Sequence, residues 1–138
     1  MKLGQNPEKM VPRKVIEHYS YYLTEDIGKG FSSKVFKGKN NKTGEIVAVK
    51  VLDMKTIKNE VQIFLLKNEI QVMKKLDNIN CLKLLDMFQT ANNTYIITEY
   101  CGHGDLKQLI SQYKTIPEQI AVKVLKHIVN GFMELAHK

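Results

Sequence analysis

The sequence predicts an α+β fold in which a five-stranded antiparallel sheet and one helix are followed by two further helices. Three observations lead to this prediction. Short β-branched segments alternate with Asn- and Gly-rich turns between residues 19 and 100, as in consecutive hairpins. Apolar residues recur at helical spacing between residues 55 and 76. A second helical repeat follows Pro117.

The composition is that of one globular domain. The 138 residues are 43% hydrophobic and 25% charged, which suffices for a core and argues against extensive disorder. The net charge of +7 comes from scattered lysines with Arg13 as the sole arginine, so we expect a solvated surface and no nucleic-acid binding. Cys81 and Cys101 form no C-x-x-C pair, and no apolar run reaches membrane-spanning length. We therefore expect a cytoplasmic protein with reduced thiols and no membrane insertion.

The N-terminal part of the predicted sheet surrounds a pair of glycines. Residues 1–18, which are mixed and polar, are predicted to be a poorly ordered lead-in. An aromatic-rich strand is expected from Tyr19 to Ile27. Gly28 and Gly30 follow where the chain must bend sharply, and glycine lets backbone approach a ligand closely.

These glycines are predicted to join two strands of a hairpin. Lys34–Lys39 is short and β-prone, a turn cluster follows, and Glu45–Leu52 is β-branched. This order excludes a Rossmann turn, and the Gly-Lys-Ser/Thr of a Walker-type loop is absent. It leaves a flap of backbone N–H groups over phosphates, with Lys50 reaching in from the following strand.

A helix is predicted next, over residues 55–76. Its apolar positions lie near 3.6-residue spacing and are Ile57, Val61, Leu65, Val72, Met73 and Leu76. Leu82–Phe88 and Thr94–Tyr100 are then predicted as two strands joined by a short polar loop, which complete the sheet.

The last two predicted helices follow a loop with two glycines. Leu106–Gln112 is the first, and the second begins around Pro117, since proline is favoured in the first helical turn. The second helix carries an apolar stripe that is typical of a core-facing helix, formed by Ile120, Val124, Leu125, Ile128, Phe132 and Leu135.

The glycine hairpin followed by a strand lysine resembles the start of a eukaryotic protein kinase domain of the Ser/Thr type. The residues that carry the resemblance are Gly28-x-Gly30-x-x-x-x-Val35 and Val47-Ala48-Val49-Lys50. The resemblance implies a kinase N-lobe at 19–98, a hinge at 99–105 and the start of a C-lobe at 106–138, after the lead-in 1–18. The stretch Ile-Gly-Lys-Gly-Phe-Ser-Ser-Lys-Val-Phe-Lys-Gly is similar to that of the autophagy-initiating kinases.

The resemblance also implies an ATP site. Its implied positions are Ile27, Gly28, Lys29, Gly30, Val35, Ala48, Lys50, Glu69, Thr98, Glu99, Cys101 and Asp105. Lys50 would engage the phosphates while the Glu69 carboxylate holds it in place, with Glu60 as the competing carboxylate. Val35 and Ala48 would project to one side of the hairpin, either as an apolar lid for adenine or as ordinary core.

At the hinge, the resemblance implies adenine binding through backbone groups. The C=O of Glu99 and the N–H and C=O of Cys101 would face the purine edge, and Thr98 would guard the pocket behind it. Asp105 has two interpretations of equal weight, as a polar residue near the ribose or as the N-cap of the next helix.

The chain departs from the family pattern at three places. Ser33 stands where the third glycine is usual, and Asn78-Ile79-Asn80 replaces a His-Pro-Asn stretch. The sequence contains neither the His-Arg-Asp catalytic loop nor Asp-Phe-Gly, so the catalytic base and the Mg²⁺ ligands of a complete domain are missing from these residues. We therefore expect the 138-residue chain alone to be inactive. The alternative is a truncated, non-catalytic kinase that binds nucleotide or a partner such as another kinase.

Overall fold

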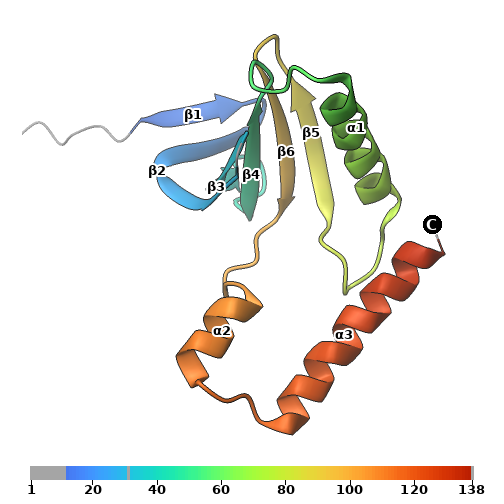
Figure 1. Ribbon diagram of the computed structural model, residues 1–138. Coiled ribbons are helices and arrows are strands. Elements are labelled where there is room, and N and C mark those ends of the chain that lie inside the picture. The colour runs from blue at the N-terminus through green and yellow to red at the C-terminus, as the bar shows by residue number, and fades with distance from the viewer. Residues whose placement is uncertain (1–11, 31, 138) are drawn as a thin grey trace, which may run out of the picture.

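The computed structural model describes residues 12–30 and 32–137. A six-stranded antiparallel sheet in the order β1-β2-β3-β4-β6-β5 stands above helices α2 and α3, and α1 covers one face of the sheet (Figure 1). The elements in chain order are β1 (Arg13–Ile16), β2 (Tyr19–Lys29), β3 (Ser33–Asn40), β4 (Ile46–Asp53), α1 (Glu60–Lys75), β5 (Leu84–Gln89), β6 (Asn93–Glu99), α2 (Leu106–Tyr113) and α3 (Glu118–Ala136). The predicted α+β class is confirmed.

The sheet has one strand more than predicted, because β1 lies within the expected lead-in. Ile16 pairs with Tyr19, so a turn of only Glu17 and His18 joins β1 to β2. Glu17 adopts φ 51°, a left-handed conformation that usually selects glycine or asparagine in such a turn. The prediction for residues 1–18 was therefore wrong from Arg13 to Ile16. Residues 1–11 lie outside the described residues.

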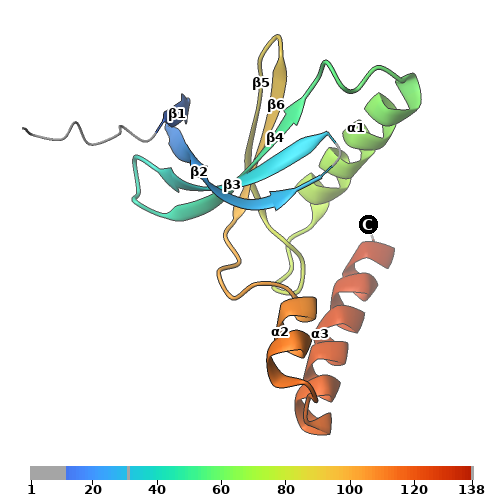
Figure 2. The ribbon, with the colours of Figure 1, turned by 60° about the vertical axis from the view of Figure 1, so that its left-hand side comes forward.

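Strand β2 bends strongly before the glycine turn, as Figure 2 shows. Its pairing with β3 shifts register between Tyr21 and Asp26 and again between Asp26 and Gly28. The Asp26 carboxylate accepts a hydrogen bond from the Gly28 N–H at 3.0 Å. Beyond the strand, the Gly30 N–H donates to the Ser33 carbonyl at 2.7 Å and closes the turn. Phe31 of this turn lies outside the described residues.

The two faces of the sheet carry separate cores, because side chains alternate along β4. Val47 and Val49 are fully buried on one face, in a cluster with Tyr19, Tyr21, Phe36 and Ile97. Leu52 and Ile96 belong to the other face, where α1 packs through Leu66 and Ile70. Lys50 shares this second face, since it lies between Ala48 and Leu52 at alternate positions of the strand.

Helix α1 begins later than predicted. Residues 54–56 form a turn, in which the Asp53 carboxylate accepts a hydrogen bond from the Lys55 N–H at 2.9 Å. The helix starts at Glu60 because Asn59 caps it, accepting a hydrogen bond from the Val61 N–H at 2.8 Å. The prediction of helix from residue 55 was wrong by this one turn.

Helices α2 and α3 follow the hinge and lie below the sheet (Figures 1 and 2). The upper part of α3 contacts the loop before β5, where the Cys81 Sγ lies 3.7 Å from the Gly131 carbonyl oxygen. A Cβ on Gly131 would come within 3.0 Å of the Asn80 carbonyl oxygen, so glycine permits this approach. Much of the apolar stripe of α3 stays exposed, including Ile120, Leu125, Ile128, Phe132 and Leu135.

Candidate functional site

The register of four strands brings the predicted phosphate-binding residues into one row. Gly28 pairs with Val35, Val35 with Lys50, and Lys50 with Ile96. Directly opposite residues in a ladder project to the same face. The glycine turn, the valine after it and the strand lysine therefore lie side by side on the face that α1 covers.

Ala48 lies in the neighbouring row on the same face. It pairs with Thr98 on β6 and with Lys37 on β3, and both Ala48 and Thr98 are buried. Since Val35 and Ala48 occupy alternate rows of one face, the predicted common side of the hairpin is the side that carries Lys50. The side chains of Val35 and Ala48 are small, so they extend only a short way from the sheet beside Lys50.

Glu69 of α1 is the carboxylate that meets Lys50. The Lys50 Nζ lies 3.8 Å from the Glu69 Oε1, and the two side chains are 33% and 54% exposed. The competing Glu60 stands at the first residue of α1, about 13 Å along the helix axis from Glu69 at 1.5 Å per residue. The structure therefore brings together the pair that the resemblance implied, at a distance that leaves the ammonium free to form further contacts.

The hinge is anchored by the side chain of Glu99. Its Oε1 accepts a hydrogen bond from the Lys83 N–H at 3.0 Å, and its own N–H donates to the Lys83 carbonyl at 3.1 Å. The Thr98 hydroxyl donates to the Glu99 carbonyl at 3.2 Å. Within residues 12–30 and 32–137, the backbone of Cys101 forms no hydrogen bond, so its N–H and C=O are available to a ligand.

A cavity of about 670 Å³ lies between the end of β2 and the hinge. Ile27 lines it from β2, and Cys101 and Asp105 line it from the hinge side. Its volume falls in the range of small-molecule sites. Lys50 and Glu69 are not among the described residues that line it. Part of the predicted adenine site therefore lies at this cavity, and the predicted phosphate-binding pair lies elsewhere on the same sheet.

Asp105 caps α2. Its carboxylate accepts a hydrogen bond from the Gln108 N–H at 2.8 Å, and its N–H donates to the Gln108 side chain at 3.3 Å. This capping box is the second of the two interpretations that the sequence left open. Asp105 also lines the hinge cavity, so the cap does not remove it from a ligand's reach.

Two lysines near the hinge were missed by the sequence analysis. The Lys37 ammonium lies 5.3 Å from the centre of the Tyr100 ring, a cation–π distance. Lys83 holds Glu99 through its backbone. Lys37 could have been found from the alternation of side chains along the strand, which puts it on the same side as Val35. No local sequence pattern marks Lys83.

The described part of the structure contains neither a cluster of metal-ligating side chains nor a helix suited to span a membrane. Within residues 12–30 and 32–137, no three His, Cys, Asp or Glu side chains come together in a way that could hold a metal. None of the helices of the described chain is long and apolar enough to cross a membrane.

Comparison with known proteins relates most of this arrangement to one family. The model of the protein kinase domain matches residues 21–138. A probable serine/threonine-protein kinase of Dictyostelium discoideum is 31% identical over 131 residues, which cover 89% of this chain and 25% of the relative. The hormonally up-regulated neu tumor-associated kinase homolog of Xenopus tropicalis is 33% identical over 111 residues, or 80% of this chain and 16% of the relative.

A third relative is also a serine/threonine-protein kinase. The serine/threonine-protein kinase ATG1 of Kluyveromyces lactis is 30% identical over 125 residues, which cover 90% of this chain and 14% of the relative. The chain thus spans a quarter or less of the length of these three relatives.

Proposed function

Because the chain belongs to the protein kinase domain family, we propose that it is the ATP-binding portion of a protein serine/threonine kinase. In such a kinase the γ-phosphate of ATP is transferred to hydroxyl groups of a protein substrate. Lys50, steadied by Glu69, binds the phosphates, and the backbone from Ile27 to Gly30 covers them. Glu99 and Cys101 hold adenine through their backbone groups.

The observation that carries this proposal is that Glu69 of α1 meets Lys50 on the face of the sheet that α1 covers. The register places Lys50 beside Val35, which in turn pairs with Gly28, and the 3.8 Å approach of Glu69 limits where the ammonium can move. A lysine held by a carboxylate presents its remaining N–H donors in a restricted direction, which favours a polyanionic ligand in one register. The free Cys101 backbone and the hinge cavity, which Asp26 and Asp105 also line, supply a second end of the site.

No magnesium site is assigned to these residues. ATP is used by kinases as its magnesium complex, but the donor set of the described residues does not form a metal cluster. The sequence of residues 1–138 also lacks the Asp-Phe-Gly and His-Arg-Asp motifs. The function proposed for this chain is therefore nucleotide binding, and we propose that phosphoryl transfer needs residues beyond these.

A second candidate function is a non-catalytic module that binds a partner protein. The observation that favours it is the exposed stripe of α3, where Phe132 is 66% and Leu125 is 59% exposed. Contiguous exposed apolar surface is typical of interaction sites. Such a module would bind its partner whether or not ATP is present.

The test of the first proposal is ATP binding by the wild-type chain and by Lys50→Ala, measured as a thermal shift with and without magnesium. Saturating ATP at about 100 times its Kd should stabilise the wild-type chain by about 2.7 kcal/mol. Removing the Lys50 charge should lower the affinity about tenfold or more, which removes at least about 1.4 kcal/mol of that stabilisation.

The matched control is Lys42→Ala, which removes an exposed lysine from the turn between β3 and β4. It should bind ATP as the wild-type chain does. Equal shifts for Lys50→Ala and the wild type would refute the assigned role of Lys50. Absence of any ATP effect, together with capture of a protein partner, would favour the second candidate.

A further inference from the structure

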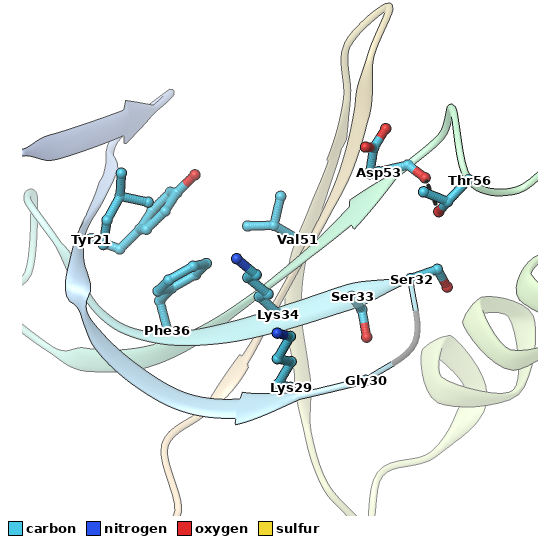
Figure 3. Close-up of a pocket in the computed structure, with 11 residues that line it drawn as sticks. Tyr21, Lys29, Gly30, Ser32, Ser33, Lys34, Phe36, Val51, Asp53 and Thr56 are labelled. Atoms are coloured by element: carbon cyan, nitrogen blue, oxygen red, sulfur yellow. Dashed lines mark hydrogen bonds between the residues drawn. The ribbon is translucent and has the colours of Figure 1, made fainter.

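A second cavity lies on the sheet face that looks away from Lys50. Its volume is about 380 Å³, within the range of small-molecule sites (Figure 3). The register defines its side of the sheet, because Lys29 pairs with Lys34 and Lys34 pairs with Val51. Val51 is the immediate neighbour of Lys50 on β4, and consecutive residues of a strand point to opposite faces. The side chains of Lys29, Lys34 and Val51 therefore lie on the face opposite Lys50, and the cavity meets the proposed phosphate site only at the glycine turn, where Gly30 lines it.

Two unpaired lysines stand at this cavity. Lys29 and Lys34 are directly opposite each other on β2 and β3, and both line the cavity. Neither ammonium group has an ion-pair partner anywhere in the described chain. Like charges placed opposite each other destabilise a β-ladder. An anion between them would convert this repulsion into two attractive contacts.

The floor of the cavity is apolar and flat. The buried rings of Tyr21 and Phe36 lie 5.1 Å apart with their planes only 28° from parallel, and Val51 lies beside them. Figure 3 shows the Lys34 ammonium directed toward the space between these three side chains. Burial, with a smaller effect of Tyr95, raises the pKa of Tyr21 to about 12, so its phenol is neutral near pH 7.

The one acidic residue that lines the cavity does not neutralise the lysines. The Asp53 carboxylate accepts a hydrogen bond from the Lys55 N–H at 2.9 Å, within its own turn. Figure 3 places Asp53 and Thr56 at the end of the cavity away from Lys29. The lysine end therefore keeps its positive charge.

We propose that this cavity binds a small amphiphilic anion, a flat apolar ring that carries a phosphate or a carboxylate. The ring packs on Tyr21, Phe36 and Val51, and the anionic group lies between Lys29 and Lys34. This site goes beyond nucleotide binding, because its charged groups and its floor belong to the opposite face of the sheet from Lys50 and Glu69.

The test is a titration of the isotope-labelled 138-residue chain with phenyl phosphate, followed by NMR, in the absence of nucleotide. We expect saturable shifts of the backbone amides of Lys29, Lys34 and Val51. Phenol and inorganic phosphate, each of which offers half of the required chemistry, should bind at least about tenfold more weakly. The same shifts should persist in Lys50→Ala, which separates this site from the proposed nucleotide site.

Two substitutions on β3 make the test specific. Lys34→Gln should weaken phenyl phosphate binding about tenfold, since it removes one charge-assisted contact. Lys39→Gln, an exposed lysine whose side chain projects to the other face of the same strand, should leave the affinity unchanged. Lys29→Gln should reproduce the loss seen with Lys34→Gln.

Three results would overturn the proposal. One is the absence of saturable shifts at Lys29, Lys34 and Val51. Another is a set of shifts that vanishes in Lys50→Ala, which would assign the ligand to the nucleotide face. The third is an equal loss of affinity in Lys34→Gln and Lys39→Gln, which would indicate attraction to the overall charge of the protein.

Discussion

The Lys50–Glu69 pair is a weak contact to which we assign a large role in the proposed function. Both side chains are partly exposed and 3.8 Å apart, and such pairs contribute about 0–1 kcal/mol to folding. Its importance for the proposed function is positional, because the carboxylate restrains a flexible four-carbon side chain. Stability and ligand binding should therefore respond differently when the pair is broken.

Glu69→Gln should separate these two effects. We expect the free energy of unfolding to change by less than about 1 kcal/mol, because the pair is solvent-screened. ATP affinity should fall by up to about tenfold, since the Lys50 ammonium loses its restraint. Urea unfolding and calorimetric ATP titration measure the two quantities.

The control for this substitution is Glu60→Gln, on the same helix but at its first turn. Loss of a negative charge there weakens the interaction with the helix dipole, yet it should not alter ATP affinity. If Glu60→Gln lowered ATP affinity as much as Glu69→Gln does, the assignment of Glu69 as the partner of Lys50 would be wrong.

Among the elements, α1 illustrates how a cap decides where a helix begins. The apolar spacing extends back to Ile57, and this residue is buried, yet it precedes the helix. Periodicity reports which residues face the core, and it does not distinguish a helix from a turn that packs in the same place. The Asn59 side chain decides the boundary by satisfying the Val61 N–H.

Asn59→Ala should destabilise the chain by about 1 kcal/mol through loss of this cap. Urea or thermal unfolding measures the change. Asn68→Ala is the matched control, because Asn68 is exposed inside α1 and alanine favours the helix interior. It should leave stability unchanged or raise it slightly. A loss in Asn68→Ala as large as in Asn59→Ala would show that the cap is not the cause.

Strand β1 escaped prediction for a related reason. Its turn consists of Glu17 and His18, with neither the glycine nor the asparagine that a two-residue hairpin turn usually contains. The strand is held instead by its pairing with β2 and by Ile16, which packs against the core of Tyr19 and Tyr21. These contacts compensate for an unfavourable conformation at Glu17.

At the scale of the whole molecule, we expect nucleotide binding to be separable from phosphoryl transfer. The proposed ATP-binding residues lie between Ile27 and Asp105, within the region matched by the protein kinase domain. The described chain has no cluster that could hold a metal, and residues 1–138 contain no catalytic-loop motif. A chain of this kind can bind ATP without stabilising the charge that develops during transfer.

We therefore expect the purified 138-residue chain to bind ATP and to phosphorylate no peptide above background. Incorporation of labelled phosphate into a mixture of Ser/Thr peptides is the measurement, after separation from kinases of the expression host. Lys50→Ala serves as the background control. Activity of the wild-type chain that Lys50→Ala abolishes would contradict this expectation.

The sequence by itself determined the local geometry of this protein. The glycines predicted the bend between two strands, the β-branched residues Glu45–Leu52 predicted the strand that carries Lys50, and the helical spacing predicted the helix that carries Glu69. Each of these features depends on the conformational preferences of neighbouring residues, which a sequence displays directly.

Only the tertiary structure decided which distant groups meet. The family resemblance implied that Glu69 meets Lys50, but their approach depends on the packing of α1 on the sheet through Leu66 and Ile70. The opposition of Lys29 and Lys34 depends on the register shifts of β2, which no local pattern specifies. Burial of apolar side chains is non-directional, so the pattern of apolar residues predicts only which side chains are buried. The packed fold is needed to show which other residues bury them.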